Sequence, residues 1–161
     1  MIKIPQGLTA KLEGSVLSVK GPKGEVTYTF PKSVKLVHEG DTLSASGPLN
    51  LQNTSLAHMR NMVKGASEGY SHKLKIIFAH FPMSLEIKGP KLIIKNFLGE
   101  KQPRNAKIVG STKIEVKGQE VTVSGCSKEH VGQTIANIRS ATKIVGRDSR
   151  VFQDGIYPIS E

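Results

Sequence analysis

Short stretches of alternating apolar and polar residues, the pattern of half-buried β-strands, recur along the chain. They lie in pairs on either side of a glycine turn, which predicts β-hairpins. Four segments carry this pattern: residues 11–25, 35–47, 86–100 and 113–125. A further apolar segment at 73–81 (KLKIIFAHF) predicts another strand, which we expect to close the first half of the chain.

Two segments change to the period of an amphipathic helix. Apolar residues recur at spacings of three and four, first at Leu56, Met59, Val63 and Ala66 and then at Val131, Ile135, Ile138 and Thr142. Ser127 is the expected N-cap of the second helix, and Gly65 and Gly146 are the expected stop signals of the two helices.

The chain also contains an internal repeat. Segment 11–25 matches segment 86–100 at an offset of 75 residues, with Gly14 aligned on Gly89. Segment 35–47 matches 113–125 at an offset of 78, and Leu56–Arg60 matches Ile135–Arg139 at 79. Because three blocks recur in the same order, we interpret the chain as a duplication.

Each copy therefore contains several short antiparallel strands and one helix with a single apolar stripe. The helix must cover a sheet, because nothing else in the copy can bury that stripe. The predicted fold class is α+β, with two tandem duplicated domains, each of short antiparallel β-sheets packed with one α-helix. We place the boundary near Pro82, giving domains 1–81 and 82–161.

The composition adds a strongly basic character to this picture. Lysine and arginine total 23 against 13 acidic residues, a net charge of +10, and only 37% of residues are hydrophobic. Such a surface attracts polyanions and favours phosphate backbones through counterion release. A basic protein without a nucleic-acid partner remains an alternative on composition alone.

Cysteine usage and the N-terminus point to a reducing compartment. Cys126 is the only cysteine, so neither an internal disulfide nor a cysteine-rich zinc site can form. The N-terminus shows no signal-peptide pattern, and no segment approaches the ~20 apolar residues of a membrane span. We expect a soluble, cytoplasmic protein with no membrane contact.

The sequence offers no catalytic constellation. The five histidines are scattered, no H-E-x-x-H pair occurs, and the carboxylates mostly lie beside lysines. Neither a P-loop nor a G-x-S-x-G nucleophile elbow is present. We therefore predict no enzyme activity, cofactor, metal or small-molecule substrate.

Two RNA-binding patterns can be weighed directly. Gly21-Pro22-Lys23-Gly24 has the G-x-x-G form of a KH domain, but the flanking segments are predicted strands, so a hairpin turn is the better interpretation. No segment matches an aromatic base-stacking motif, and core packing is expected for Phe78, Phe81 and Phe97. Contact with phosphates and 2′-hydroxyls of folded RNA therefore fits better than base stacking.

Arginine is concentrated in the second half, which holds four of the five arginines. Its planar guanidinium binds phosphate through two hydrogen bonds, which suits RNA contacts. The polar segment 99–107 and the segment 143–150 after the second helix each carry three cations. The predicted RNA-binding residues are Lys101, Arg104, Lys107, Arg139, Lys143, Arg147 and Arg150.

These segments also resemble a known family. NFLGEK at 96–101, VGQT at 131–134 and RVFQDGIY at 150–157 are similar to the large-subunit ribosomal protein that is sixth in bacterial naming and ninth in eukaryotic naming. The first and last of these motifs resemble its archaeal and eukaryotic branch. Two positions depart from the family pattern: Ser140 replaces a frequent glutamine, and Pro158 replaces an aliphatic residue.

The resemblance implies two tandem α+β domains and a structural, non-catalytic role in translation. It implies that the second domain is the main rRNA-binding domain, near the sarcin–ricin loop and the stalk base, with neighbouring large-subunit and stalk-base ribosomal proteins as partners. Lys101 and Arg104 match the family's loop motif, and Arg147, Arg150 and Asp154 match its tail. The chain ends at Glu161 with little basic extension, so the family's contacts through its last residues are not expected here.

Two other functions stay open at this point. The chain could be a stand-alone RNA-binding or RNA-chaperone module outside the ribosome. An RNA-directed enzyme is the third possibility, disfavoured because no catalytic cluster occurs.

Overall fold

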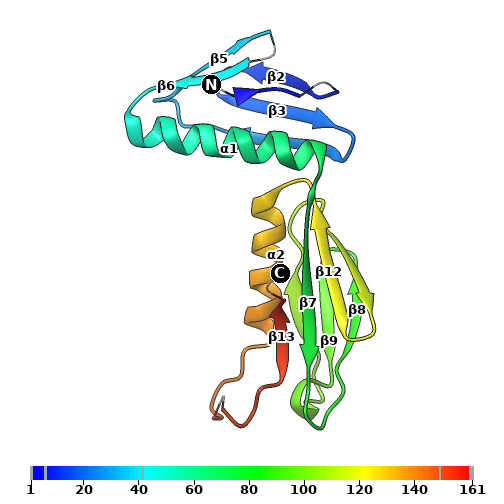
Figure 1. Ribbon diagram of the computed structural model, residues 1–161. Helices are drawn as coiled ribbons and strands as arrows, with labels where there is room; N and C mark the ends of the chain where they lie inside the picture. The colour runs from blue at the N-terminus through cyan, green and yellow to red at the C-terminus, as the bar shows by residue number, and fades with distance from the viewer. Residues whose placement is uncertain (1, 6, 41, 149, 160–161) are drawn as a thin grey trace. The chain divides into compact units, whose positions relative to one another are not determined.

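The computed structural model describes residues 2–5, 7–40, 42–148 and 150–159. It separates into two compact units, one formed by residues 1–70 and 126–128 and the other by 71–125 and 129–161. In both units antiparallel strands are combined with one helix (Figure 1). The α+β architecture predicted from the repeat is confirmed.

The first unit contains two three-stranded sheets, ordered β2-β3-β4 and β1-β6-β5. Helix α1 (Leu49–Ser67) packs on strands from both of them. The helix and the inner sheet faces enclose one core, in which Leu17, Phe30 and Met59 are almost fully buried. The strands are β1 (Ile2–Lys3), β2 (Thr9–Glu13), β3 (Val16–Gly21), β4 (Gly24–Thr29), β5 (Lys35–Glu39) and β6 (Thr42–Ser46).

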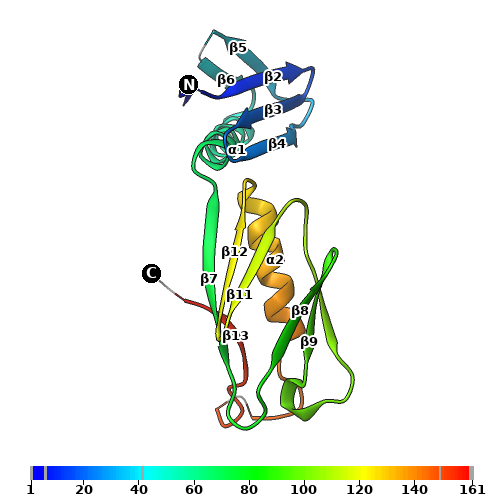
Figure 2. The same ribbon diagram turned by 90° about the vertical axis from the view of Figure 1, so that its right-hand side faces the viewer.

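The second unit repeats this plan, with sheets ordered β8-β9-β10 and β7-β12-β11, and adds one strand, β13, beside β7. Figures 1 and 2 show helix α2 (Lys128–Ala141) lying along the sheets of this unit. Val131, Thr134 and Ile138 of the helix are fully buried. The strands are β7 (Tyr70–Ile77), β8 (Ser84–Lys88), β9 (Lys91–Lys95), β10 (Arg104–Lys107), β11 (Lys113–Lys117), β12 (Glu120–Gly125) and β13 (Gly155–Pro158), with a 3₁₀ turn, η1, at Phe97–Gly99.

All four predicted hairpins are present: β2–β3, β5–β6, β8–β9 and β11–β12. The G-x-x-G segment also forms a hairpin turn, with Gly21 paired to Gly24 between β3 and β4. A KH loop, which lies between two helices, is therefore excluded.

The predicted helix ends differ from the observed ones. Helix α1 begins at Leu49, before the periodic residues, and continues through Gly65 to Ser67. Gly65 is needed for another reason: a Cβ atom there would collide with the backbone carbonyl of Cys126. Helix α2 begins directly after Ser127, as predicted, but ends at Ala141, before Gly146.

The compact units also divide the chain at a different place from the predicted Pro82 boundary. Strand β7, which we expected to close the first unit, pairs with β13 and lies beside β12 in the second. It occupies the position that β1 occupies beside β6 in the first unit, so it opens the second copy. Strand β1, the counterpart of β7 in the first unit, has only two residues. Its sequence is too short to be recognised as a repeat of β7.

Candidate nucleic-acid interface

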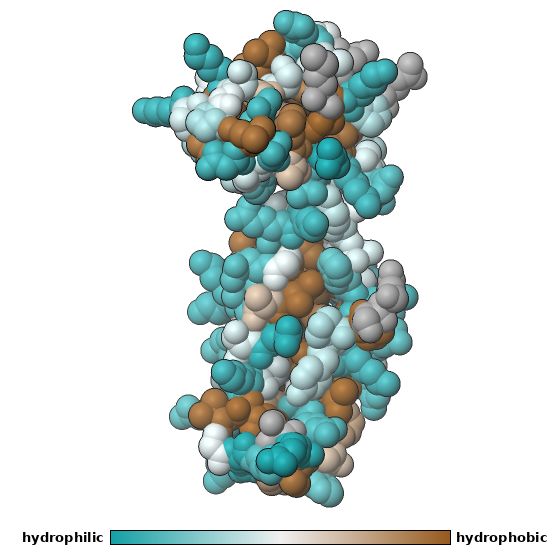
Figure 3. Space-filling view, turned by 60° about the vertical axis from the view of Figure 1, so that its left-hand side comes forward, coloured by the Kyte–Doolittle hydropathy of each residue, from teal (hydrophilic) through white to brown (hydrophobic). Residues whose placement is uncertain are grey.

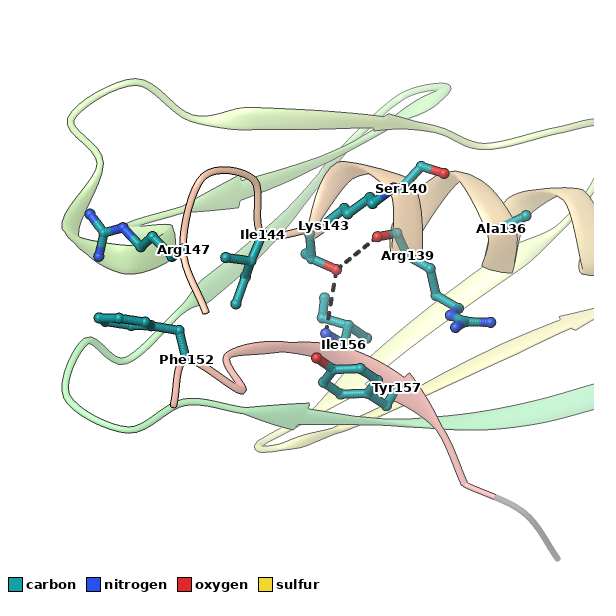
Figure 4. A pocket seen from close by; sticks show the side chains of 10 residues that line it. Ala136, Arg139, Ser140, Lys143, Ile144, Arg147, Phe152, Ile156 and Tyr157 are labelled. Atoms are coloured by element: carbon teal, nitrogen blue, oxygen red, sulfur yellow. Dashed lines mark hydrogen bonds between the residues drawn. The ribbon is translucent and has the colours of Figure 1, made fainter. Parts of the chain in front are cut away.

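A groove of about 630 Å³ lies in the second unit, where the end of α2 faces β13 (Figure 4). Three basic residues line it, and no acidic side chain does so among the residues the structure describes. Because nothing in its lining offsets these cations, the groove is suited to an anionic ligand. The lining residues are Ala136, Arg139, Ser140, Thr142, Lys143, Ile144, Arg147, Phe152, Ile156 and Tyr157.

The three cations are presented by one stretch of chain. Arg139 lies in the last turn of α2, Lys143 follows the end of the helix, and Arg147 comes just after Gly146, whose φ is +74°. The sequence predicted all three as RNA-binding residues, and the structure brings them into one groove.

Buried Thr142 joins the two sides of the groove. Its single hydroxyl proton is shared between the carbonyl oxygens of Ile138 and Arg139, at 3.1 and 3.3 Å, and its oxygen accepts a hydrogen bond of 3.4 Å from the backbone N–H of Ile156. The end of α2 is thereby fixed against β13 (Figure 4). The sequence predicted Thr142 only as part of the apolar stripe of the helix.

Arg104, at the start of β10, holds the end of α2 from another direction. Its Nη1 atom donates to the carbonyl oxygens of Ala141 and Lys143, at 2.9 and 3.1 Å. Its Nε and Nη2 atoms donate to the two carboxylate oxygens of Glu100, at 2.8 and 2.6 Å. The guanidinium also lies over the ring of Phe97, 4.3 Å from its centroid.

These contacts give Arg104 a structural role. Four of the five N–H donors of a guanidinium are engaged within the protein. A cation at the carbonyl end of α2 is also favoured by the helix dipole. Arg104 stays a predicted RNA contact through its remaining N–H, but its main effect is to position the segment that carries Lys143 and Arg147.

Arg147 forms a second cation–π pair. Its guanidinium lies 5.0 Å from the centre of the Phe152 ring, and both residues line the groove. The contact with the ring restricts the rotamers of the long Arg147 side chain before a ligand binds, so less conformational entropy is lost on binding. Phe152 was not singled out from the sequence, since nothing there brings the two residues together.

Comparisons with known proteins establish the family of the chain. The family model described as Ribosomal protein L6 matches residues 4–69 and 81–155. This chain belongs to that family. It is a ribosomal protein and not an enzyme, as the sequence predicted.

Curated relatives called large ribosomal subunit protein uL6 match over almost the whole chain, and three of them illustrate the similarity. The relative from Methanobrevibacter smithii is 47% identical, covering 99% of this chain and 94% of its own length. Those from Methanosarcina mazei and Methanococcus vannielii are 45% and 44% identical, covering 99% of this chain and 95% and 92% of their own lengths. The predicted resemblance to the archaeal and eukaryotic branch of the family is confirmed by these archaeal relatives.

The other predicted RNA-binding residues of this ribosomal protein lie outside the groove lining. Lys101 and Lys107 are exposed, at the start of the loop before β10 and at the end of that strand. Arg150 is also exposed, with its guanidinium 3.5 Å from the Asp148 carboxylate. Asp154, which matched the family's tail motif, is buried directly before β13.

The two departures from the family pattern have clear places in the structure. Ser140 lines the groove. Pro158 ends β13, which is an edge strand. Proline has no backbone N–H, and on the open side of an edge strand no hydrogen-bond partner is left without a donor.

The described residues contain no cluster of three or more His, Cys, Asp or Glu side chains that could hold a metal ion. None of the described helices has the length and apolar character needed to span a membrane. Figure 3 shows the side of the second unit with apolar and hydrophilic side chains interspersed over it.

The ion pair of Arg104 predicts an acid-sensitive second unit. The hydrogen bond from Arg104, with smaller Coulombic effects of Arg104 and Arg147, lowers the pKa of Glu100 from its ordinary 4.5, although partial burial opposes this. A carboxyl with a lowered pKa stabilises the folded state above its unfolded pKa, and that stability is lost as the pH falls through its folded pKa. As the pH is lowered below about 4.5, the free energy of unfolding of the second unit should therefore fall more steeply in the parent than in Glu100→Gln. Amide hydrogen exchange of α2 measures this difference. In an Arg104→Met background the same comparison should show a much smaller difference, because only the weaker Coulombic effect of Arg147 remains. A difference as large as in the parent would contradict the role of Arg104 and assign the lowered pKa of Glu100 to another cation.

Proposed function

We propose that this ribosomal protein binds rRNA of the large subunit through the groove at the end of α2. The observation that carries the proposal is the convergence of Arg139, Lys143 and Arg147 on a groove with no acidic side chain in its described lining. Each cation that neutralises a phosphate releases a counterion, and this release favours RNA over neutral or cationic partners.

Folded, largely helical RNA fits the rest of the surface. The net charge of +10 is carried mostly by exposed lysines on strands and turns, such as Lys101 and Lys107. Cations spread in this way can follow a phosphate backbone without reading its sequence. On this proposal, the second unit, which holds β7 as well as most of the predicted domain 82–161, is the main rRNA-binding domain.

The family resemblance supports a more specific place in the ribosome. We propose that the bound RNA lies near the sarcin–ricin loop and the stalk base, where the protein would support the region that binds translation factors. Neighbouring large-subunit and stalk-base ribosomal proteins would complete its surroundings.

Sedimentation distinguishes a ribosomal constituent from a free RNA-binding module. We expect the tagged protein to migrate with the large subunit and to stay bound through a high-salt wash, because a constituent is held by many simultaneous contacts. Protein found at the top of the gradient before the wash would contradict the proposal. When the ribosomal subunits are dissociated before the gradient is run, the protein should be found in the large-subunit fractions and not in the small-subunit fractions.

A further inference from the structure

The ring of Tyr157 has an unusual position on β13. A Cβ atom added to Gly155 would lie only 3.0–3.1 Å from the Cε2, Cζ and hydroxyl oxygen atoms of Tyr157. The ring is therefore folded back along the strand and lies across the glycine backbone. Despite this contact the residue remains 39% exposed.

The exposed Tyr157 side chain belongs to the lining of the basic groove. Tyr157 lines the basic groove together with Arg139 and Lys143, and Figure 4 shows it on the β13 side, opposite the end of α2. The aromatic ring of Phe152, in the same groove, already has the Arg147 guanidinium over it. Tyr157 is thus the aromatic side chain of the groove that is free to receive a planar ligand, among those the structure describes.

We propose that Tyr157 stacks against an unpaired base of the bound RNA, while Arg139 and Lys143 bind the adjacent phosphates. The inference rests on the proposed function and adds to it that the groove receives an unpaired nucleotide as well as duplex backbone. Every base has a π-face, so stacking on an aromatic ring tolerates any sequence. Three cations, with no acidic side chain in the described lining of the groove, favour a nucleotide over a peptide side chain as the planar group.

This assignment differs from what the sequence indicated. No aromatic stacking motif was found there, and Tyr157 was not considered as a binding residue. Its role depends on the i, i+2 relation to Gly155 along an edge strand and on the approach of α2, neither of which a motif search can detect.

The test uses the full chain and two RNA hairpins that differ by a single bulged nucleotide, a 2-aminopurine. The parent should bind the bulged hairpin about tenfold more tightly than the fully paired one, which corresponds to the lower part of the range measured for one base stacked on an aromatic ring. The fluorescence of the 2-aminopurine should be quenched on binding, as a stacked base requires.

Three variants separate stacking from other effects. Tyr157→Leu should abolish both the tenfold preference and the quenching, whereas Tyr157→Phe should keep both. Gly155→Ala keeps the ring but displaces it, since the new Cβ occupies its place, and should reduce the preference several-fold. Urea unfolding of each variant confirms that it is folded before binding is compared.

Each outcome bears on a distinct claim. Equal affinity of the parent for both hairpins, with a steep salt dependence, would overturn the stacking role and leave the proposed function intact. Weak binding of both hairpins without salt dependence would overturn the two together. Loss of the preference in Tyr157→Phe would also overturn stacking, because the ring is retained and only the hydroxyl is removed.

Discussion

Replacing Arg139, Lys143 and Arg147 together with alanine is expected to weaken rRNA binding by roughly 10²–10³-fold at about 0.1 M salt. Each lost phosphate contact should flatten the slope of log K against log salt by ~0.9, so three contacts remove about 2.7 log units at that concentration. The measurement is a salt titration of binding to a large-subunit RNA fragment that covers the sarcin–ricin loop and the stalk base. The three side chains line one groove, so the triple substitution removes all the basic side chains from the described lining of that groove.

The matched control removes the same charge from the first unit. Lys11, Lys32 and Lys35 are exposed there, and their replacement with alanine changes the net charge equally. We expect this variant to keep most of its affinity and nearly the parent's salt slope. If both triple variants lose the same affinity, the protein binds RNA by overall charge, and the groove has no special role.

Arg104→Ala should lower the stability of the second unit by about 2–3 kcal/mol. Hydrogen bonds to charged groups contribute roughly 1.5–3 kcal/mol and a cation–π pair ~0.5–2, and the sum is reduced because the side chain is 29% exposed. The substitution leaves the carbonyls of Ala141 and Lys143 and the Glu100 carboxylate without their donor. Amide exchange of buried residues in α2 should then accelerate roughly 30- to 150-fold.

Two comparisons make this result specific. Exchange in α1 should change little, because that helix belongs to the other compact unit. Lys107→Ala, an exposed position on the same strand as Arg104, should alter stability by no more than about 0.5 kcal/mol. Arg104→Lys should restore only part of the stability lost in Arg104→Ala. A lysine ammonium lacks the planar, forked donors with which the guanidinium binds two carbonyls and two carboxylate oxygens at once. Unchanged exchange in Arg104→Ala would show that the end of α2 is held by Thr142 and the core alone.

The hairpins were predictable because they depend on local patterns. Alternation of apolar and polar residues, with glycine at turns such as Gly14 and Gly89, fixes a strand pair almost without reference to the rest of the chain. The helix ends were less predictable. Helix α1 continues through Gly65 because tertiary packing outweighs the weak helix propensity of one glycine.

The aromatic residues show the same limit. Phe97 is buried as expected, whereas Phe81 is 48% exposed and Tyr157, on an edge strand, lines the groove. Apolar neighbours in sequence suggest a buried side chain, but β7 ends at Ile77, so Phe81 lies in the loop that follows the strand and not in the predicted strand 73–81. For a residue on a strand, such as Tyr157, the sheet decides which face meets the core. A one-residue difference in register reverses that outcome.

The sequence by itself determined the duplicated α+β architecture, the basic character of the surface and the family, because repeats, periodicity and charge are properties of the order of residues. It also identified the cations from which the groove is built. Only the tertiary structure decided that Arg139, Lys143 and Arg147 line one groove, that Arg104 fastens the end of α2, and that Tyr157 lies across Gly155. These relations join residues up to 39 positions apart, such as Arg104 and Lys143. Such contacts depend on how β10, α2 and β13 pack around a common core, and no local pattern encodes that packing.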